Sequence, residues 1–224
     1  LVLILLGALF VRLYKIDYPI ADWHSWRQAD TAAVARNFYQ EGFNPLLPKG
    51  DDMSAIASGQ GQNLKRYRFV EFPIYPTLVY IGYLISGGID ERIARLINAL
   101  ISLGSLVFVY LLAKKYFSVR VGLLAAAIYA FLPFNVFFSR TTLPEPSLVF
   151  FSLGMLYFLE QWIVRPARKN FILGVIFLAL AFLTKPVAGF YLVPLFYVYY
   201  QHEHRLWPIP KRYFILLLTG LIPF

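Results

Sequence analysis

Acidic and basic side chains suited to group transfer occur in a few short stretches of an otherwise apolar chain. A carboxylate can take the proton from an acceptor hydroxyl, and fixed cations can stabilise a phosphate leaving group. Ionisable groups at membrane depth are costly, so they tend to mark functional sites. We therefore select Asp30 and Glu145 as catalytic candidates. The substrate-binding candidates are basic or acidic residues of the same stretches: Arg27, Arg68, Glu71, Arg140 and Lys185.

The composition places the chain among membrane proteins. Hydrophobic residues make up 59% of the 224 and charged residues only 15%, whereas a soluble domain carries about a quarter charged residues. The net charge of +9 comes from short basic clusters between apolar runs. That distribution is typical of membrane-topology signals and does not indicate a nucleic-acid partner. Cysteine is absent, which excludes disulfides and thiolate sites.

Seven apolar stretches are long enough to be membrane spans, allowing for snorkelling at their ends. They cover residues 1–14, 93–113, 119–138, 147–164, 170–184, 187–201 and 213–224. Because the first and last stretches reach the two ends of the sequence, we expect it to be a fragment with residues missing at both ends. An eighth stretch at 72–88 is shorter, carries two prolines near its start and is rich in tyrosine.

The distribution of basic residues decides between two topologies. Three connections are rich in Lys, Arg or His: 114–120, 165–169 and 202–212. They fall on one side, the cytoplasmic side, only if 72–88 does not cross the membrane. The long segment 15–92 is not positive overall, and it then faces outside together with the turns at 139–146 and 184–186. We therefore predict that 72–88 is an interfacial helix on the outer surface.

The outer segment is expected to contain two surface helices joined by a loop. Residues 27–41 have a helical period, and Gly42 and Pro45 end it. Residues 44–63 are rich in Gly, Pro, Asp and Ser and predict a loop. The expected fold is all-α: a polytopic transmembrane helical bundle with interfacial helices in a long first outer loop.

Structural roles compete with the catalytic ones. Glu145 starts a helix, where the helix dipole favours an acid, and Lys185 ends one. Asp30 has poor propensity for a helix interior, and its structural alternative is a pair with Arg27 three residues earlier. Glu71 could be a plain surface charge.

Other polar residues are given structural roles. Arg12 and Lys15 are expected to extend along apolar surface to the membrane interface. His202 and His204 have a spacing that only weakly indicates a metal site, because no other ligand lies near them.

Five segments, taken together, resemble the polytopic GT-C glycosyltransferases, and most closely the lipid A aminoarabinose transferases and the protein O-mannosyltransferases. They are residues 22–39, ValGluPheProIleTyrPro (70–76), GluArgIleAlaArgLeu (91–96), SerArgThrThrLeuProGluProSer (139–147) and PheLeuThrLysPro (182–186). Each motif is loose, whereas their order and spacing are more specific. The resemblance covers essentially the whole chain, as the N-terminal part of such an enzyme.

The resemblance implies a polyprenyl-phosphate-sugar donor, an inverting transfer and a site on the outer face. In this family an acid of the first outer loop is the base, and an acid of the second outer turn, here Glu145, supports it. Where aminoarabinose enzymes carry Asp, this chain has Arg27, so Asp30 is the nearest acid and Asp22 the alternative. A phosphate-binding Lys of those enzymes is replaced by Phe72. Phosphate binding then falls to one of three cations: Arg68, Lys65 or Lys185.

The function expected from these observations is a membrane glycosyltransferase that acts on a lipid, glycan or protein acceptor. We expect an integral protein of a bacterial or archaeal plasma membrane, with its active site facing outside. A divalent cation near Glu145 is the one cofactor considered, and no metal ligands are assigned. The alternative is a polytopic transporter or lipid flippase, which would place polar groups at the bilayer midplane within repeated halves. The predicted spans have almost no ionisable residues and show no repeat, which favours the enzyme. A third alternative is a structural or scaffolding subunit.

Overall fold

The computed structural model describes residues 1–20, 22–54 and 61–203. The predicted span 213–224 and His204 lie outside these residues. Within them the regular structure is helical, with one isolated bridge between Lys49 and Tyr67 and no strand. The all-α prediction is therefore confirmed. The chain divides into two compact units, and each is described by itself.

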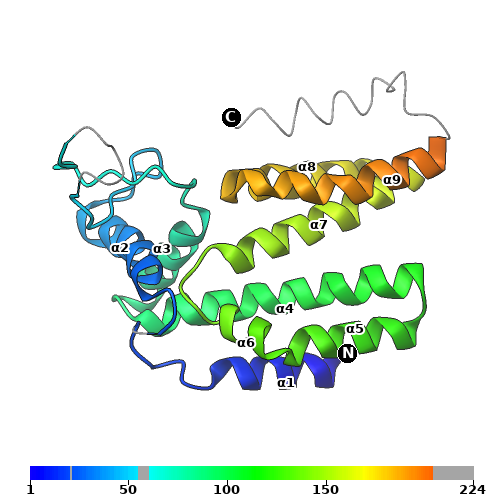
Figure 1. Ribbon diagram of the computed structural model, residues 1–224, viewed down its shortest axis with the longest axis horizontal. Coiled ribbons are helices and arrows are strands. Elements are labelled where there is room, and N and C mark those ends of the chain that lie inside the picture. The colour runs from blue at the N-terminus through cyan, green and yellow to red at the C-terminus, as the bar shows by residue number, and fades with distance from the viewer. Residues whose placement is uncertain (21, 55–60, 204–224) are drawn as a thin grey trace. The chain divides into compact units, whose positions relative to one another are not determined.

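The first unit covers residues 2–103 and 130–146. It contains α1 (Val2–Leu13), α2 (Ser25–Glu41), α3 (Ile74–Ser86), the first half of α4 (Glu91–Tyr116) and α6 (Pro133–Phe138). Helices α2 and α3 pack against each other (Figure 1). Their shared core is apolar and aromatic: Ala35, Tyr75, Val79, Tyr83 and Ala94. The two helices predicted on either side of the outer loop are thus present, and they form one packed pair.

Local sequence explains the ends of α2 and α3. Helix α2 stops at Gly42, whose φ of 104° favours glycine. Helix α3 follows Pro73 and ends at Gly87 in the left-handed conformation. A Cβ atom at Gly82 would lie 2.5 Å from the Ile93 side chain, so the absence of a side chain there lets α3 approach α4 closely.

Arg12 differs from the sequence expectation. Instead of reaching the membrane interface, it is fully buried. Its guanidinium donates to Ser102 Oγ at 3.2 Å, to Ala8 O at 2.9 Å and to Ala130 O at 2.9 Å. These acceptors belong to α4, α1 and the end of α5 (Val119–Phe131). A buried charge needs such hydrogen bonds, so Arg12 is a structural connector of three helices.

The second unit contains the other half of α4, most of α5, most of α7 (Glu145–Val164), α8 (Arg168–Thr184), the 3-10 helix η1 (Pro186–Tyr191) and α9 (Leu192–Glu203). Its buried core is formed by Met155, Leu159, Trp162, Ile163, Leu178, Leu195 and Tyr199. A Cβ atom at Gly154 would lie 2.1 Å from the Phe177 ring, so this glycine permits close packing of α7 and α8.

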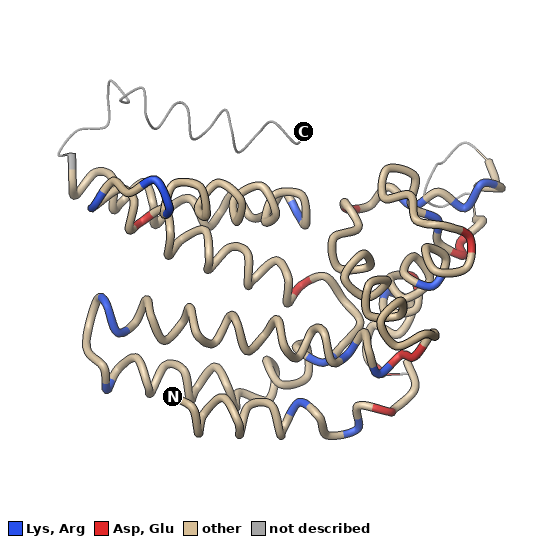
Figure 2. The backbone as a smooth tube through the Cα atoms, turned by 180° about the vertical axis from the view of Figure 1, so that it is seen from behind, with Lys and Arg blue, Asp and Glu red and all other residues tan. Residues whose placement is uncertain are grey.

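Two described helices, α4 and α7, are long and apolar enough to cross a membrane. Charged residues lie mainly near helix ends, and long stretches of the helices carry none (Figure 2). The predicted span 119–138 is interrupted, because Pro133 cannot continue α5 and instead starts α6. The predicted span 187–201 likewise begins as η1 and continues as α9.

Candidate active site

Helix α2 and the segment that precedes α3 bring four of the predicted site residues into two ion pairs. Arg27 Nη2 donates to both carboxylate oxygens of Glu71, at 2.7 and 2.6 Å. Arg68 Nη1 lies 2.8 Å from Asp30 Oδ2. These four side chains are only 13–21% exposed, so their attraction is screened less than that of surface pairs.

This pairing contradicts the structural alternative in which Arg27 and Asp30 form a pair within the helix. Both residues instead reach across to the segment before α3, 38 to 44 residues later in the chain. Residues three apart are neighbours on a helix. Arg27 and Asp30 nevertheless form their ion pairs with residues that are distant in the sequence. Glu71 is likewise more than a plain surface charge, because it accepts both hydrogen bonds from Arg27.

A small cleft lies beside these pairs. It is lined by residues of α2, the outer loop and the start of α3, including Thr31, Val34, Arg68 and Glu71. Its free volume is about 20 Å³, which is enough for about one water molecule. A cleft of this volume is too small for a sugar ring.

Gln28 is a residue that the sequence analysis missed. It is fully buried, and its Oε1 accepts a hydrogen bond from Thr142 N at 3.0 Å. Its Nε2 donates to Asp22 Oδ1 at 2.5 Å and to Trp23 O at 3.0 Å. Gln28 thus joins the start of α2 to the turn before Glu145. It also holds Asp22, the alternative base, in a structural hydrogen bond.

The turn that carries Glu145 is held from α4 as well. Asn98 Nδ2 donates to Thr141 O at 2.6 Å and to Leu143 O at 2.7 Å. Glu145 is partly buried at the first residue of α7, where the helix dipole favours a carboxylate. Gln28 and Asn98 therefore connect the elements that bear Asp30 and Glu145. The proposed cooperation of the two acids stays a prediction.

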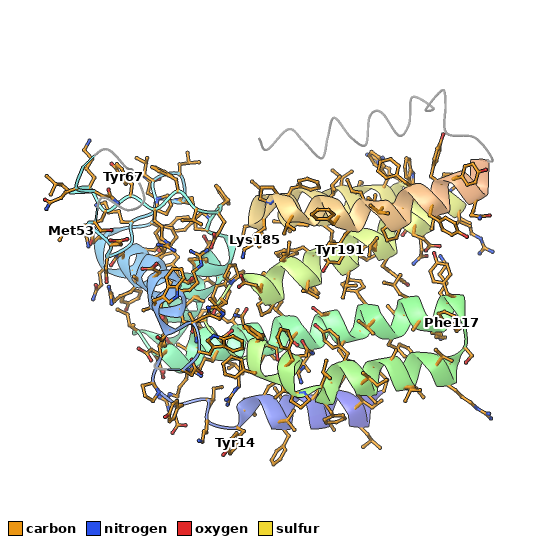
Figure 3. All side chains as sticks on the ribbon, viewed as in Figure 1. Tyr14, Met53, Tyr67, Phe117, Lys185 and Tyr191 are labelled. Carbon is orange, nitrogen blue, oxygen red and sulfur yellow. The ribbon has the colours of Figure 1, made fainter. Side chains whose placement is uncertain are left out.

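Arg140 has other partners than the ion-paired group, and Lys185 belongs to the other unit. Arg140 donates to Tyr14 O, and its guanidinium lies 5.9 Å from the centroids of the Tyr14 and Phe137 rings. No contact joins it to Asp30 or Arg68 within the described part of the chain. Lys185 belongs to the second unit, between α8 and η1 (Figure 3). Its participation in the site stays a prediction.

A buried arginine on α4 is a second residue without a sequence-based assignment. Arg95 is 1% exposed and donates to Pro19 O at 3.3 Å. Among the described residues, its Nε and Nη1 have no hydrogen-bond partner. Tyr75 lies near it and donates to Ala94 O at 2.9 Å. Burial raises the pKa of Tyr75 well above its ordinary value, so this phenol stays protonated and remains a donor.

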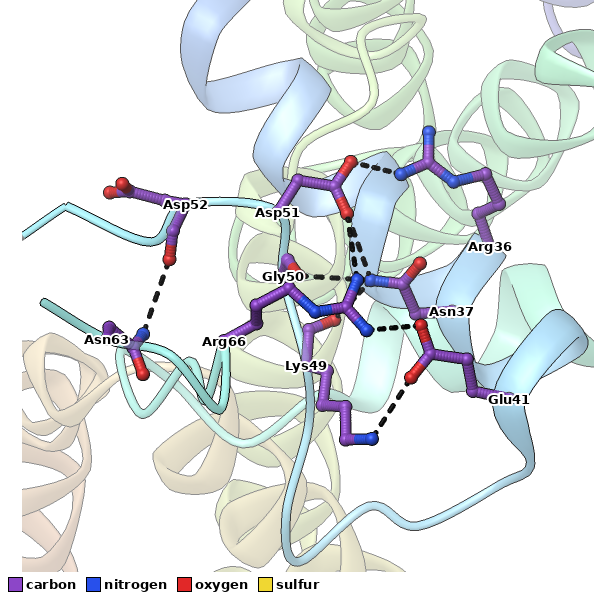
Figure 4. Close-up of polar contacts among 9 residues, drawn as sticks. All are labelled: Arg36, Asn37, Glu41, Lys49, Gly50, Asp51, Asp52, Asn63 and Arg66. Atoms are coloured by element: carbon purple, nitrogen blue, oxygen red, sulfur yellow. Dashed lines mark hydrogen bonds and ion pairs between the residues drawn. The ribbon is translucent and has the colours of Figure 1, made fainter.

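The C-terminal half of α2 forms a separate ionic network with the outer loop (Figure 4). Arg36 binds Asp51, while Glu41 binds Arg66 and, at 3.0 Å, Lys49. Hydrogen bonds from Arg66 and Lys49 hold the pKa of Glu41 below its ordinary value. Within the described ranges, no group of three His, Cys, Asp or Glu is arranged to hold a metal ion. The ion pairs of this network connect α2 to the outer loop.

Comparison with known proteins supports a family assignment. An uncharacterised protein of Aquifex aeolicus is 37% identical over 124 residues, covering 55% of this chain and 28% of that protein. A second uncharacterised protein of the same bacterium is 27% identical over 230 residues, covering 97% of this chain and 42% of that protein. The chain thus spans less than half the length of these relatives. No solved structure matches it.

A sequence profile of one family matches residues 71–224. The matched range starts at Glu71 of the site and includes Glu145 and Lys185, whereas Arg27 and Asp30 precede it. The chain belongs to the dolichyl-phosphate-mannose-protein mannosyltransferase family.

Proposed function

We propose that the protein is a membrane glycosyltransferase of the GT-C type. It transfers a sugar from a polyprenyl-phosphate donor to an acceptor hydroxyl at the outer membrane face, with inversion at the anomeric carbon. Family membership supports the reaction class. The observation that carries the site assignment is the partly buried Asp30 carboxylate, held 2.8 Å from Arg68 beside a second pair of opposite charges.

The chemistry needs one base and one fixed cation. In the proposed step Asp30 accepts the proton of the acceptor hydroxyl, while that oxygen forms a bond to the anomeric carbon. The bond from this carbon to the phosphate oxygen breaks, and the phosphate keeps the electron pair. Arg68 is suited to the growing negative charge, because a guanidinium forms strong hydrogen bonds with phosphate oxygens.

The ion pair between Asp30 and Arg68 supplies a route to an active base. In the structure both charges are neutralised by each other, and the cleft holds about 20 Å³ of free volume. A donor phosphate competes with Asp30 for the same guanidinium. Transfer of Arg68 from the carboxylate to the phosphate leaves Asp30 free to accept a proton. Activation of the base is thereby linked to donor binding.

The pair of Arg27 and Glu71 has a positioning role in this scheme. Its two hydrogen bonds tie the start of α2 to the residue that precedes Phe72 and Pro73, at the entry to α3. These hydrogen bonds hold the backbone positions of Asp30 and Arg68 relative to each other while Arg68 moves from the carboxylate to the phosphate. Glu145, reached through Gln28 and Thr142, is proposed to orient the acceptor or a divalent cation.

The membrane placement proposed here puts α2 and α3 on the outer surface, with α3 at headgroup depth. The 13 residues of α3 are short for a span, and tyrosine, which recurs along this helix, is enriched at membrane interfaces. Single cysteines at Asp52 and Phe117 of the full-length protein test this topology with a membrane-impermeant label. We expect labelling of Asp52→Cys from outside only and of Phe117→Cys from inside only. Labelling of both from one side overturns the interfacial placement.

The activity is tested on the full-length protein with a panel of polyprenyl-phosphate sugars and lipid, glycan and peptide acceptors. We expect transfer with at least one pair. Asp30→Asn should lower the rate about 10²–10⁴-fold, as expected for loss of a general base. Asp51→Asn is the matched control, because Asp51 is an exposed acid of the loop network. Equal rates for the two variants refute Asp30 as the base, and Asp22→Asn is then the next variant.

A further inference from the structure

A second, larger cavity lies at the C-terminal half of α2. Its volume is about 280 Å³, and its lining includes Asn37, Glu41, Leu47, Lys49 and Tyr67. Tyr67 comes from the segment that returns toward α3 (Figure 3) and pairs with Lys49 in the isolated bridge. None of its lining residues also lines the small cleft beside Arg68. It is therefore a separate site.

The charges of this cavity cancel. Its lining contains one carboxylate, Glu41, and one ammonium, Lys49, whose Nζ lies 3.0 Å from Glu41 Oε2. Arg66 also binds Glu41 and shares its charge with Asp51 (Figure 4). Among the lining residues, a phosphate would therefore find no cation without a carboxylate partner, and a metal ion would find no carboxylate without a cation partner. The cavity is suited to a neutral ligand.

Hydrogen-bonding groups of both kinds remain available in the cavity. Asn37 uses its Nδ2 for the carbonyl oxygens of Lys49 and Gly50, at 3.0 and 3.1 Å. Within the described residues, Asn37 Oδ1 and the Tyr67 hydroxyl make no hydrogen bond, and Lys49 Nζ makes one of its three. The residues that carry this acceptor, this hydroxyl and this donor line the cavity together with Phe38. Ligand pockets combine apolar surface with a few such polar groups.

We propose that this cavity binds a neutral hexose ring of the acceptor, an assignment that rests on the glycosyltransferase function proposed above. A sugar ring offers several hydroxyls that both donate and accept, no charge, and a C–H face that can pack on an aromatic ring. The cavity volume of about 280 Å³ is near the lower end of the roughly 300–1,000 Å³ found for ligand pockets, which fits a single ring.

The position along α2 also favours an acceptor sugar. Asn37 follows Asp30 by seven residues, which corresponds to about 10 Å along the helix axis and nearly the same face. A sugar held beside Asn37 would thus lie two helical turns from the proposed base. The cavity is a place for an acceptor ring whose neighbouring residue in the acceptor presents its hydroxyl to Asp30.

The test measures binding of methyl hexopyranosides to the full-length protein in detergent by saturation-transfer NMR, with inorganic phosphate as the anionic probe. Leu47→Trp fills the cavity, and Leu46→Trp is the matched control, because Leu46 is more exposed and does not line it. We expect at least one hexoside to bind, with a tenfold or greater loss in Leu47→Trp and little change in Leu46→Trp. Tyr67→Phe removes one hydroxyl and should weaken binding several-fold without filling space.

Several outcomes overturn the assignment. The first is that no hexoside gives a signal. The second is that the two tryptophan variants give equal hexoside signals and Tyr67→Phe binds hexosides as the wild type does. The third is that phosphate binds and no hexoside does. The result is independent of the base assignment. If Asp30→Asn abolishes transfer while Leu47→Trp leaves acceptor KM unchanged, the cavity proposal fails and the transferase stands. If hexoside binding depends on Leu47 but no lipid-linked sugar is used, the transferase fails and the sugar site stands.

Discussion

The two halves of α2 carry the same kinds of charged residue but place them in different surroundings. In the N-terminal half, Arg27 and Asp30 and the two residues that they bind are 13–21% exposed. In the C-terminal half, the members of the network around Glu41 and Asp51 are 29–48% exposed. Coulomb attraction increases as the local dielectric constant falls, and exposed pairs contribute little. The difference in burial therefore distinguishes the candidate catalytic pairs at the start of α2 from the ion pairs that hold the loop at its end.

After the loss expected for Asp30→Asn, the largest difference in transfer rate is expected between variants of two arginines in the same segment, Arg68 and Arg66. Arg68→Gln removes the cation proposed to bind the donor phosphate, and transfer should fall about 10²-fold or more, as for loss of an oxyanion donor. Arg66→Gln breaks the contacts with Glu41 and Asp51 and, at saturating acceptor, should leave transfer near wild type. Steady-state rates at saturating and limiting donor measure the contrast. Similar losses in both variants would show that the loop as a whole, rather than Arg68, supports catalysis.

The second contrast concerns stability. Glu71→Gln leaves the partly buried Arg27 without its carboxylate, and the free energy of unfolding should fall by about 1–3 kcal/mol, typical of hydrogen bonds to charged groups. Glu41→Gln, at an exposed position, should change it far less. Thermal unfolding of the two variants in the same detergent measures this. A larger loss from Glu41→Gln than from Glu71→Gln would reverse the comparison.

A third contrast asks whether the second unit contributes a cation. Lys185→Ala should weaken donor use several-fold, whereas Lys114→Ala, at the end of α4, should have little effect. The reason is that Lys185 is predicted on the outer side and Lys114 on the inner side. Donor KM for the two variants measures the difference. Matching KM values would remove Lys185 from the site and leave donor binding to Arg68.

The smallest effect is expected when the pH is lowered, and it concerns the stability of the outer loop. The pKa values of Glu41 and Asp51 are lowered in the folded protein, so the unfolded state binds more protons as pH falls. Their stabilisation of the loop is present above their ordinary pKa values of 4.5 and 3.8. It is lost as pH falls through the lowered values. Limited proteolysis of the outer loop between pH 6 and pH 3 should show a gradual increase in cleavage. Glu41→Gln should reduce this pH dependence, and an unchanged profile would contradict the role of Glu41.

Much of the fold follows from the sequence alone. Helical periodicity and the stop at Gly42 predicted α2, and the distribution of basic residues predicted a short helix at 72–88, where α3 lies. Apolar length predicted α4 and α7. These features depend on local propensity and on hydropathy, both of which can be read along the chain. The same local information identified Asp30, Arg27, Arg68 and Glu71 as candidates.

The partners of those residues were decided by tertiary structure. Arg27 and Asp30 are neighbours on the helix, but each binds a residue of the segment before α3, because packing of α2 on α3 places that segment against them. Packing also buried Arg12 among backbone carbonyls, where sequence predicted an interfacial side chain. The role of Gln28 depends on a contact between distant segments, because its partner Thr142 lies in the turn before α7. Sequence determines which groups are available, whereas contacts between distant segments determine which of them are buried and paired.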